Sequence, residues 1–233
     1  MEGRRPVTHR TFETVAQSGL ITVQALGGEA ETLVIAFASI GHDASRPPSP
    51  EFVASATAQD RTALFVLDSA RSWGQTPDFA VALHQALTTI RTRQRITRIV
   101  TVGQSMGGYC ALLAASILPV DAVLAFGPQW NPQDPRWHPW TDALDPAPPP
   151  LPPAAWCVLM HGMADDAAQA LAFPQRKGID HLLYDALTHS ALCPHLKARG
   201  VMRGMVDALA TGDRRRLIRL ATGAGGRRLQ LPR

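Results

Sequence analysis

The residues best suited to chemistry form a short motif near the middle of the chain. Gly103, Ser105 and Gly107 are spaced as Gly-x-Ser-x-Gly, after the strand-like run 98–102 and before the apolar run 106–118. This pattern predicts a strand, a sharp turn and a helix, with the serine hydroxyl raised above the sheet. Glycine is needed on both sides, because side chains there would collide where strand and helix approach. The first amides of such a helix suit a developing negative charge, so we expect Ser105 to be a nucleophile.

Acidic and histidine side chains follow two later strand-like runs. The segment His161-Gly162-Met163-Ala164-Asp165-Asp166 comes after the run 155–160, and Thr188-His189-Ser190 comes after the run 181–184. The three motifs and their order resemble those of the α/β-hydrolase superfamily. Its members carry the triad in the order nucleophile, acid, histidine along the chain. The resemblance spans residues 20–210.

The resemblance implies a role for each of these residues. Asp165 matches the acid of the triad, and His189 matches the general base that takes the serine proton. Asp166 is expected to cap the next helix, although it stays an alternative acid. Asp134, after the preceding strand, is a third choice for the acid, because some family members draw it from there. His195 is the alternative base, and His161 is implied to be structural.

An oxyanion hole needs two backbone amides, and the family places one of them directly after the nucleophile. That residue is Met106 here. The second amide comes from the loop after the strand 32–38, where many members carry His-Gly but this chain reads Phe-Ala-Ser-Ile-Gly. We choose Ser39 there, with Ala38 as the alternative. Trp73 follows another strand. We expect it either to line the acyl or alcohol pocket or to be a tryptophan of the core or of the pocket rim.

The elements that must position these residues alternate between strand and helix. Strands are predicted over 20–26, 32–38, 62–67, 98–102, 122–126, 155–160 and 181–184, and helices over 77–93, 106–118, 166–173 and 201–210. Such alternation predicts an α/β fold with a mostly parallel, doubly wound sheet and helices on both faces. Residues 1–210 are expected to form this single domain.

One segment interrupts the alternation. Residues 127–153 hold ten of the nineteen prolines together with Trp130, Trp137 and Trp140. A stretch of this length without helix or strand periodicity is long for a connection in a compact domain. It is interpreted as a cap that lines the substrate pocket, or as a surface loop held down by its own tryptophans.

The composition restricts the class of protein. The 233 residues, 45% hydrophobic and 18% charged, suit one globular domain with a full core. No apolar run is long enough to cross a bilayer, and Met1–Gly19 shows no secretory signal. Cys110, Cys157 and Cys193 lie in apolar surroundings without metal-like spacing, so they are read as buried thiols of a cytoplasmic protein. No cofactor or metal is implied.

The charge is concentrated at the end of the chain. Residues 211–233 hold seven arginines and one acid, Asp213, whereas the whole chain has a net charge of +4. Such a tail can bind nucleic acid or an anionic surface, but it has no aromatic side chains for base stacking. It is read as a solvated, partly disordered end.

The function these features favour is hydrolysis of an ester or related acyl bond in a small molecule, through an acyl-enzyme intermediate. The same triad also serves acyltransferases, thioesterases and peptidases, because all of them pass through a tetrahedral oxyanion. A non-catalytic binding protein of the same fold is the alternative from another class.

Overall fold

The computed structural model describes residues 11–41, 43, 45–142, 144–145, 147–152 and 155–229. The expectations for residues 1–10, including most of the segment searched for a secretory signal, and for residues 230–233 lie outside this range. Among the described residues, no helix is both long and apolar enough to span a membrane.

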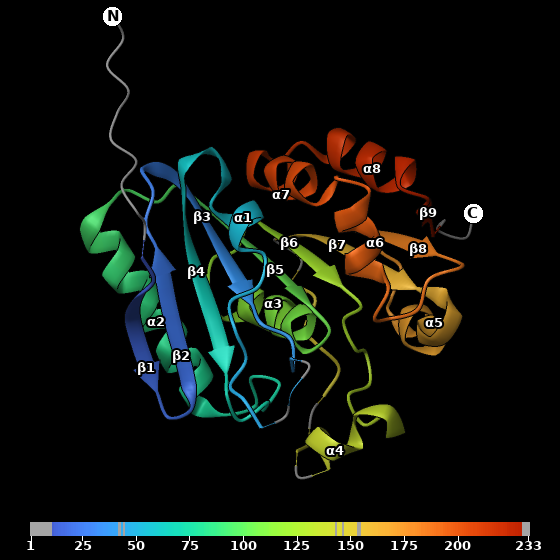
Figure 1. Ribbon diagram of the computed structural model, residues 1–233, viewed down its shortest axis with the longest axis horizontal. Coiled ribbons are helices and arrows are strands. Elements are labelled where there is room, and N and C mark those ends of the chain that lie inside the picture. The colour runs from blue at the N-terminus through green and yellow to red at the C-terminus, as the bar shows by residue number, and fades with distance from the viewer. Residues whose placement is uncertain are drawn as a thin grey trace, which may run out of the picture.

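A nine-stranded sheet runs through the molecule (Figure 1) in the order β1-β2-β4-β3-β5-β6-β7-β8-β9. Strands β4, β3, β5, β6, β7 and β8 pair in parallel, while β1, β2 and β9 pair antiparallel at the two edges. The strands are β1 Glu13–Ser18, β2 Ile21–Leu26, β3 Ala30–Phe37, β4 Arg61–Asp68, β5 Arg98–Gln104, β6 Ala122–Phe126, β7 Trp156–Gly162, β8 Ile179–Tyr184 and β9 Arg227–Arg228. The predicted mostly parallel α/β sheet is confirmed.

Helices cover both faces of the sheet (Figure 1). Helices α2 and α3 pack on one face, and α1 and α7 pack on the other, with α8 against α7. The helices are α1 Val53–Ala56, α2 Pro77–Arg93, α3 Met106–Ile117, α4 His138–Thr141, α5 Met163–Ala172, α6 Leu192–Ala198, α7 Met202–Thr211 and α8 Arg214–Gly223.

Strand β3 shows why the central strands read as continuous apolar runs. Leu33, Ile35 and Phe37 face the core beneath α2 and α3, whereas Val34 and Ala36 face the core beneath α1 and α7. Because successive side chains of a strand point to opposite faces, a strand covered on both sides must be apolar throughout. The carboxyl ends of these parallel strands share one edge, where the candidate site lies.

The C-terminal segment corrects the sequence-based interpretation. Residues Arg214–Gly223 form helix α8, with Leu217 buried, and Arg227–Arg228 extend the sheet beside β8. The expectation of a partly disordered end is wrong for these residues, whereas most of their arginine side chains are solvated, as expected. Two arginines of this segment, Arg214 and Arg228, form ion pairs with the buried carboxylate of Asp180 on β8. Charge density in the sequence could not reveal that partner.

Candidate active site

Ser105 lies at the junction between strand β5 and helix α3. Its backbone has φ 56° and ψ −125°, a conformation that non-glycine residues rarely adopt. The strain is held by the neighbouring strand, because the Ser105 amide donates to the carbonyl of Phe126 at 2.8 Å. Strained backbone that the surroundings enforce is typical of functional positions.

The two glycines of the motif are required by close backbone approach. A Cβ atom added to Gly103 would lie 2.1 Å from the carbonyl oxygen of Gly107, and one added to Gly107 would lie 2.3 Å from that of Phe37. No side chain fits at either position. The steric reason inferred from the sequence is therefore the one found in the structure.

The imidazole of His189 is paired with Asp166. His189 Nδ1 and Asp166 Oδ2 are 2.5 Å apart, and the Asp166 side chain is 2% exposed. Asp165 was expected in this position, and that placement is wrong. The Asp165 carboxylate instead accepts a hydrogen bond from the backbone amide of His189 at 2.6 Å.

The register of helix α5 explains the difference. The sequence-based interpretation ended the strand at residue 160 and began the helix at residue 166, with the acid on a loop between them. Strand β7 in fact continues to Gly162, and α5 begins at Met163, so both aspartates lie in its first turn. The buried face of α5 carries Asp166, Gln169 and Ala170, three and four residues apart. Asp165 lies off that face.

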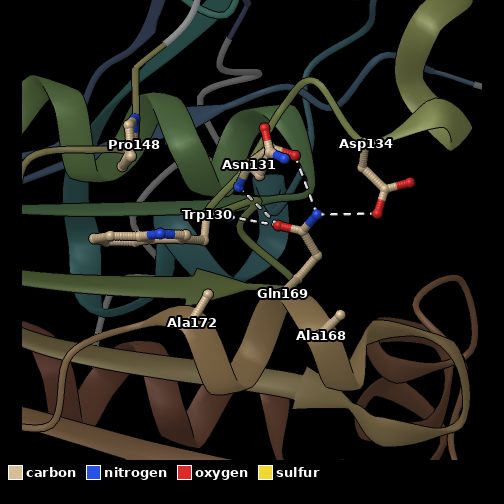
Figure 2. Close-up of a pocket in the computed structure, with 7 residues that line it drawn as sticks. All are labelled: Trp130, Asn131, Asp134, Pro148, Ala168, Gln169 and Ala172. Carbon is tan, nitrogen blue, oxygen red and sulfur yellow. Dashed lines mark hydrogen bonds between the residues drawn. The ribbon is translucent and has the colours of Figure 1, made fainter.

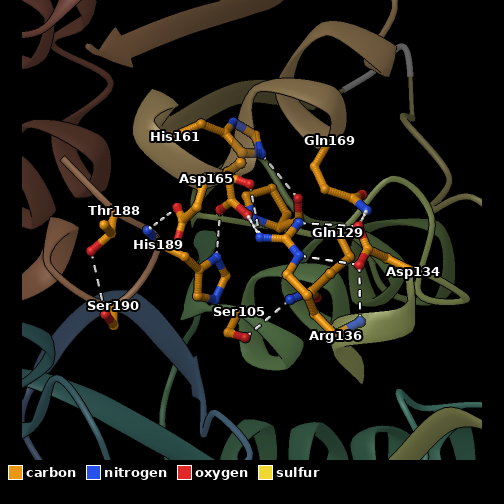
Figure 3. Close-up of polar contacts among 12 residues, drawn as sticks. Ser105, Gln129, Asp134, Arg136, His161, Asp165, Gln169, Thr188, His189 and Ser190 are labelled. Carbon is orange, nitrogen blue, oxygen red and sulfur yellow. Dashed lines mark hydrogen bonds and ion pairs between the residues drawn. The ribbon is translucent and has the colours of Figure 1, made fainter. Parts of the chain in front are cut away.

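Arg136 of the segment after β6 also binds Asp166. Its Nη1 lies 3.0 Å from Asp166 Oδ1, and its Nε and Nη2 donate to Asp134 (Figure 3). The hydrogen bond from Arg136 lowers the pKa of Asp134 to about 2. Asp134, the third candidate for the acid, thus pairs with arginine rather than with His189. Nothing near Arg136 in the sequence marks a catalytic motif, so no local signal could have identified this residue.

Gln129 contacts the serine directly. Its Nε2 donates to Ser105 Oγ at 3.0 Å (Figure 3). Its Oε1 accepts from Trp73 Nε1 at 3.3 Å. The Nε2 atom of His189, which would take the serine proton, is buried and has no hydrogen-bond partner among the described residues. Gln129 was not expected, although its place three residues after β6 puts it at the carboxyl edge of the sheet.

The amides proposed for the oxyanion hole have different surroundings. Met106 begins helix α3, as expected. The Ser39 amide donates to Glu51 Oε1 at 3.1 Å, and the Ala38 amide donates to the carbonyl of Val66. Both choices for the second donor are therefore occupied. A carboxylate holds an amide more strongly than a neutral acceptor does, which disfavours release of Ser39.

Solved structures with a similar fold include two hydrolases and an acetyltransferase. A serine hydrolase without a lid from Xanthomonas campestris aligns over 87% of this chain and 95% of its own, at 15% identity and TM-score 0.57. An esterase from Pyrobaculum calidifontis aligns over 89% and 86%, at 13% identity and TM-score 0.59. The capsule O-acetyltransferase of Neisseria meningitidis serogroup A aligns over 86% and 96%, at 12% identity and TM-score 0.55.

This chain has the α/β-hydrolase fold. No protein-family model and no curated protein matches its sequence. The likeness therefore concerns the fold, and chemistry must be argued from the site.

Two buried histidines, His161 and His181, are hydrogen-bonded to each other and to the loop that carries Gln129. His161 Nε2 lies 3.0 Å from the carbonyl oxygen of Pro128, which can only accept, so this nitrogen carries the proton. His161 Nδ1 then accepts from His181 Nε2 at 2.8 Å. Burial lowers the pKa of His161 to about 4 and that of His181 to about 3, so both rings stay neutral near pH 7. The structural role expected for His161 agrees with these contacts.

Residues after β6 cover the edge of the sheet where Ser105 and His189 lie, with positions 143, 146 and 153–154 outside the described residues. Trp137 packs on His189 with ring centroids 5.0 Å apart. Trp130 packs on Phe173, and Trp140 is half-buried against the core. Trp73 is fully buried, so its side chain offers no surface to a substrate here and instead holds Gln129.

A pocket of about 420 Å³ lies between this segment and helix α5 (Figure 2). Trp130, Asn131, Asp134 and Gln169 supply much of its wall, and Ser105 and His189 do not line it. Its polar side chains already bind one another, because Gln169 donates to Asp134 and accepts from the amides of Trp130 and Asn131. Of the candidates for the triad, Asp134 lines this pocket, whereas Ser105, His189 and Asp166 do not.

The remaining candidates have structural contacts. His195, the alternative base, lies with Nε2 2.8 Å from the carbonyl oxygen of Ala224, which ties α6 to the end of α8. Cys110, Cys157 and Cys193 are free thiols. Within the described ranges, no group of three or more His, Cys, Asp or Glu side chains is placed to hold a metal ion.

Proposed function

We propose that this chain is a serine hydrolase that cleaves an ester or related acyl bond of a small molecule through an acyl-enzyme intermediate. Ser105 is the nucleophile, His189 the general base and Asp166 the acid. The observation that carries the proposal is the strained Ser105 at the start of α3, in one site with His189 paired to the buried Asp166. A binding protein would gain nothing from this combination of strain and buried charge.

The hydrogen bonds assign each atom a task in this mechanism. Asp166 is a carboxylate acceptor, so His189 carries its proton on Nδ1 and leaves Nε2 to accept. Nε2 takes the Ser105 proton as Oγ attacks the acyl carbon, and then protonates the departing alcohol. Water attacks the acyl-enzyme by the same route in reverse, and Oγ regains its proton.

Acyl transfer, thioester cleavage and peptide cleavage remain alternatives on the same triad, and they differ in the group that accepts or leaves the acyl carbon. The capsule O-acetyltransferase shares the fold, which supports acyl transfer as the second candidate. Nucleic-acid binding by the C-terminal arginines is disfavoured, because Arg214, Arg227 and Arg228 are paired with aspartates. The free thiols agree with the cytoplasm as the proposed location.

The test is covalent labelling of the wild-type protein with a fluorophosphonate, followed by assay of Ser105→Ala with short-chain aryl esters. We expect the label on Ser105 and a loss of kcat on the order of 10⁴-fold or more in the variant, with an unchanged fold by circular dichroism. An unlabelled wild-type protein, or a variant with near wild-type turnover, would contradict the proposal.

A further inference from the structure

Gln129 joins two loops across the catalytic serine. It follows β6, whereas its partner Trp73 follows β4, and these strands flank the β3–β5 pair in the sheet. Their contact therefore spans the carboxyl ends of β3 and β5, beside the start of α3. The loop of Trp73 is also joined to α3, because Gln75 Nε2 donates both to the carbonyl of Trp73 and to the hydroxyl of Tyr109. An oxyanion at Ser105 would form in this region.

The side-chain amide of Gln129 is fixed in orientation. Gln129 is 1% exposed, and the indole N–H of Trp73 can only donate, so it selects the oxygen of the amide. The nitrogen must then face Ser105 Oγ, 3.0 Å away. The backbone that carries Gln129 is held in turn, because the His161 ring binds the carbonyl of Pro128. A donor preorganised in this way loses little entropy when charge develops.

The backbone donors expected for this task are already in use. Ser39 binds the Glu51 carboxylate with its amide and with its hydroxyl, and the Ala38 amide belongs to the pairing of β3 with β4. One donor from Met106 would leave an oxyanion short of its second partner.

We infer that the Nε2 amide of Gln129 supplies the second oxyanion donor, an inference that rests on the proposed function. When Oγ bonds to the acyl carbon, the carbonyl π pair moves onto the oxygen two bonds from Oγ, and the serine proton moves to His189. Gln129 transfers no proton. Before the attack its amide donates to Oγ. After the attack it donates to the former carbonyl oxygen of the substrate, which has gained the negative charge.

The experiment compares Gln129→Met, which keeps the length without a donor, with Gln129→Glu, which can still accept from Trp73. For both variants we expect kcat for an aryl ester to fall on the order of 10²–10³-fold, with KM changed little. Affinity for phenylboronic acid, which forms an anionic tetrahedral adduct with a serine, should fall roughly tenfold or more. Trp73→Phe, which keeps a ring but releases the amide, should show a smaller loss of kcat.

Thermal unfolding of each variant separates loss of the donor from loss of fold, and a variant that fails to fold leaves the others to decide. If the folded Gln129 variants keep kcat within about threefold of wild type, or exceed it, the inference is overturned while the proposed function stands. If the wild-type protein is neither labelled by fluorophosphonate nor active, the proposed function fails and the inference falls with it.

Discussion

Two adjacent acids, Asp165 and Asp166, illustrate how little sequence separates different roles. Both lie in the first turn of α5 and both bind His189, one through the backbone amide and the other through the ring. Only the carboxylate on the ring can select the imidazole tautomer and stabilise an imidazolium. Asp166 also carries the cost of burial, which Arg136 offsets with an ion pair.

The two acids predict different effects when each loses its charge. Asp166→Asn should lower kcat for an aryl ester on the order of 10⁴-fold, because an amide can donate to Nδ1 and select the wrong tautomer. Asp165→Asn is the matched control, since its amide oxygen can still accept from the His189 backbone, and it should keep activity within about tenfold. Steady-state kinetics decide, and the reverse order of losses would return the role of the acid to Asp165.

At the scale of elements, the segment after β6 is joined to the catalytic groups by several side chains. Gln129 binds Ser105, Arg136 binds Asp166, and Trp137 packs on His189. The Tyr109 hydroxyl of α3 ties a later part of the segment by donating to the carbonyl of Ala147. These contacts place the segment on the catalytic edge, as a cap requires, and its influence on substrate choice stays a prediction.

Trp137 is the residue to test in this segment. Its Nε1 atom is buried without a hydrogen-bond partner among the described residues, and its ring packs on that of His189. Trp137→Ala should lower kcat roughly tenfold or more and change chain-length preference, because the ring that fixes His189 is lost. Trp137→Phe keeps an aromatic ring and should retain most of kcat.

Trp140→Ala, a change away from His189, should alter mainly stability. Kinetics across esters of increasing chain length make the measurement, and an unchanged profile in all three variants excludes a role in substrate choice.

At the scale of the whole molecule, the C-terminal residues close one edge of the sheet. Asp180 of β8 accepts from Trp156, Arg214 and Arg228, so a single carboxylate joins β7, α8 and β9. Burial alone raises the pKa of Asp180, but the hydrogen bonds from Arg214 and Trp156 outweigh it and leave this pKa below its ordinary value. The folded state therefore favours the charged carboxylate.

Removal of this charge should loosen the C-terminal elements. We expect Asp180→Asn to reduce the free energy of unfolding by about 1–3 kcal/mol, because a fully buried acceptor of charged hydrogen bonds is lost. Asp185→Asn is the control, since Asp185 pairs with Arg227 where both are exposed, and it should lower the stability by much less than Asp180→Asn does. Urea denaturation measures both variants. Equal losses would mean that the end of the chain adds little to the stability of the domain.

The sequence by itself determined the elements whose signals are local. Helix α2 begins at Pro77 and ends at Arg93 as predicted, because the proline start and the apolar spacing act within the helix itself. Strand β6 matches its prediction, Ala122–Phe126, since a strand buried on both faces must be apolar throughout. Gly103 marked the serine turn, because the steric conflict it avoids, with the carbonyl of Gly107, arises within five residues of chain, whereas the conflict at Gly107 is with Phe37 of β3.

Only the tertiary structure decided which side chains meet. The choice between Asp165 and Asp166 depended on where β7 ends, and one or two residues of helix register turn a carboxylate toward the core or away from it. Gln129 and Trp73 are 56 residues apart, and the arginines of α8 and β9 reach an aspartate on β8. Such contacts depend on the order of strands in the sheet, which no local pattern of residue types encodes.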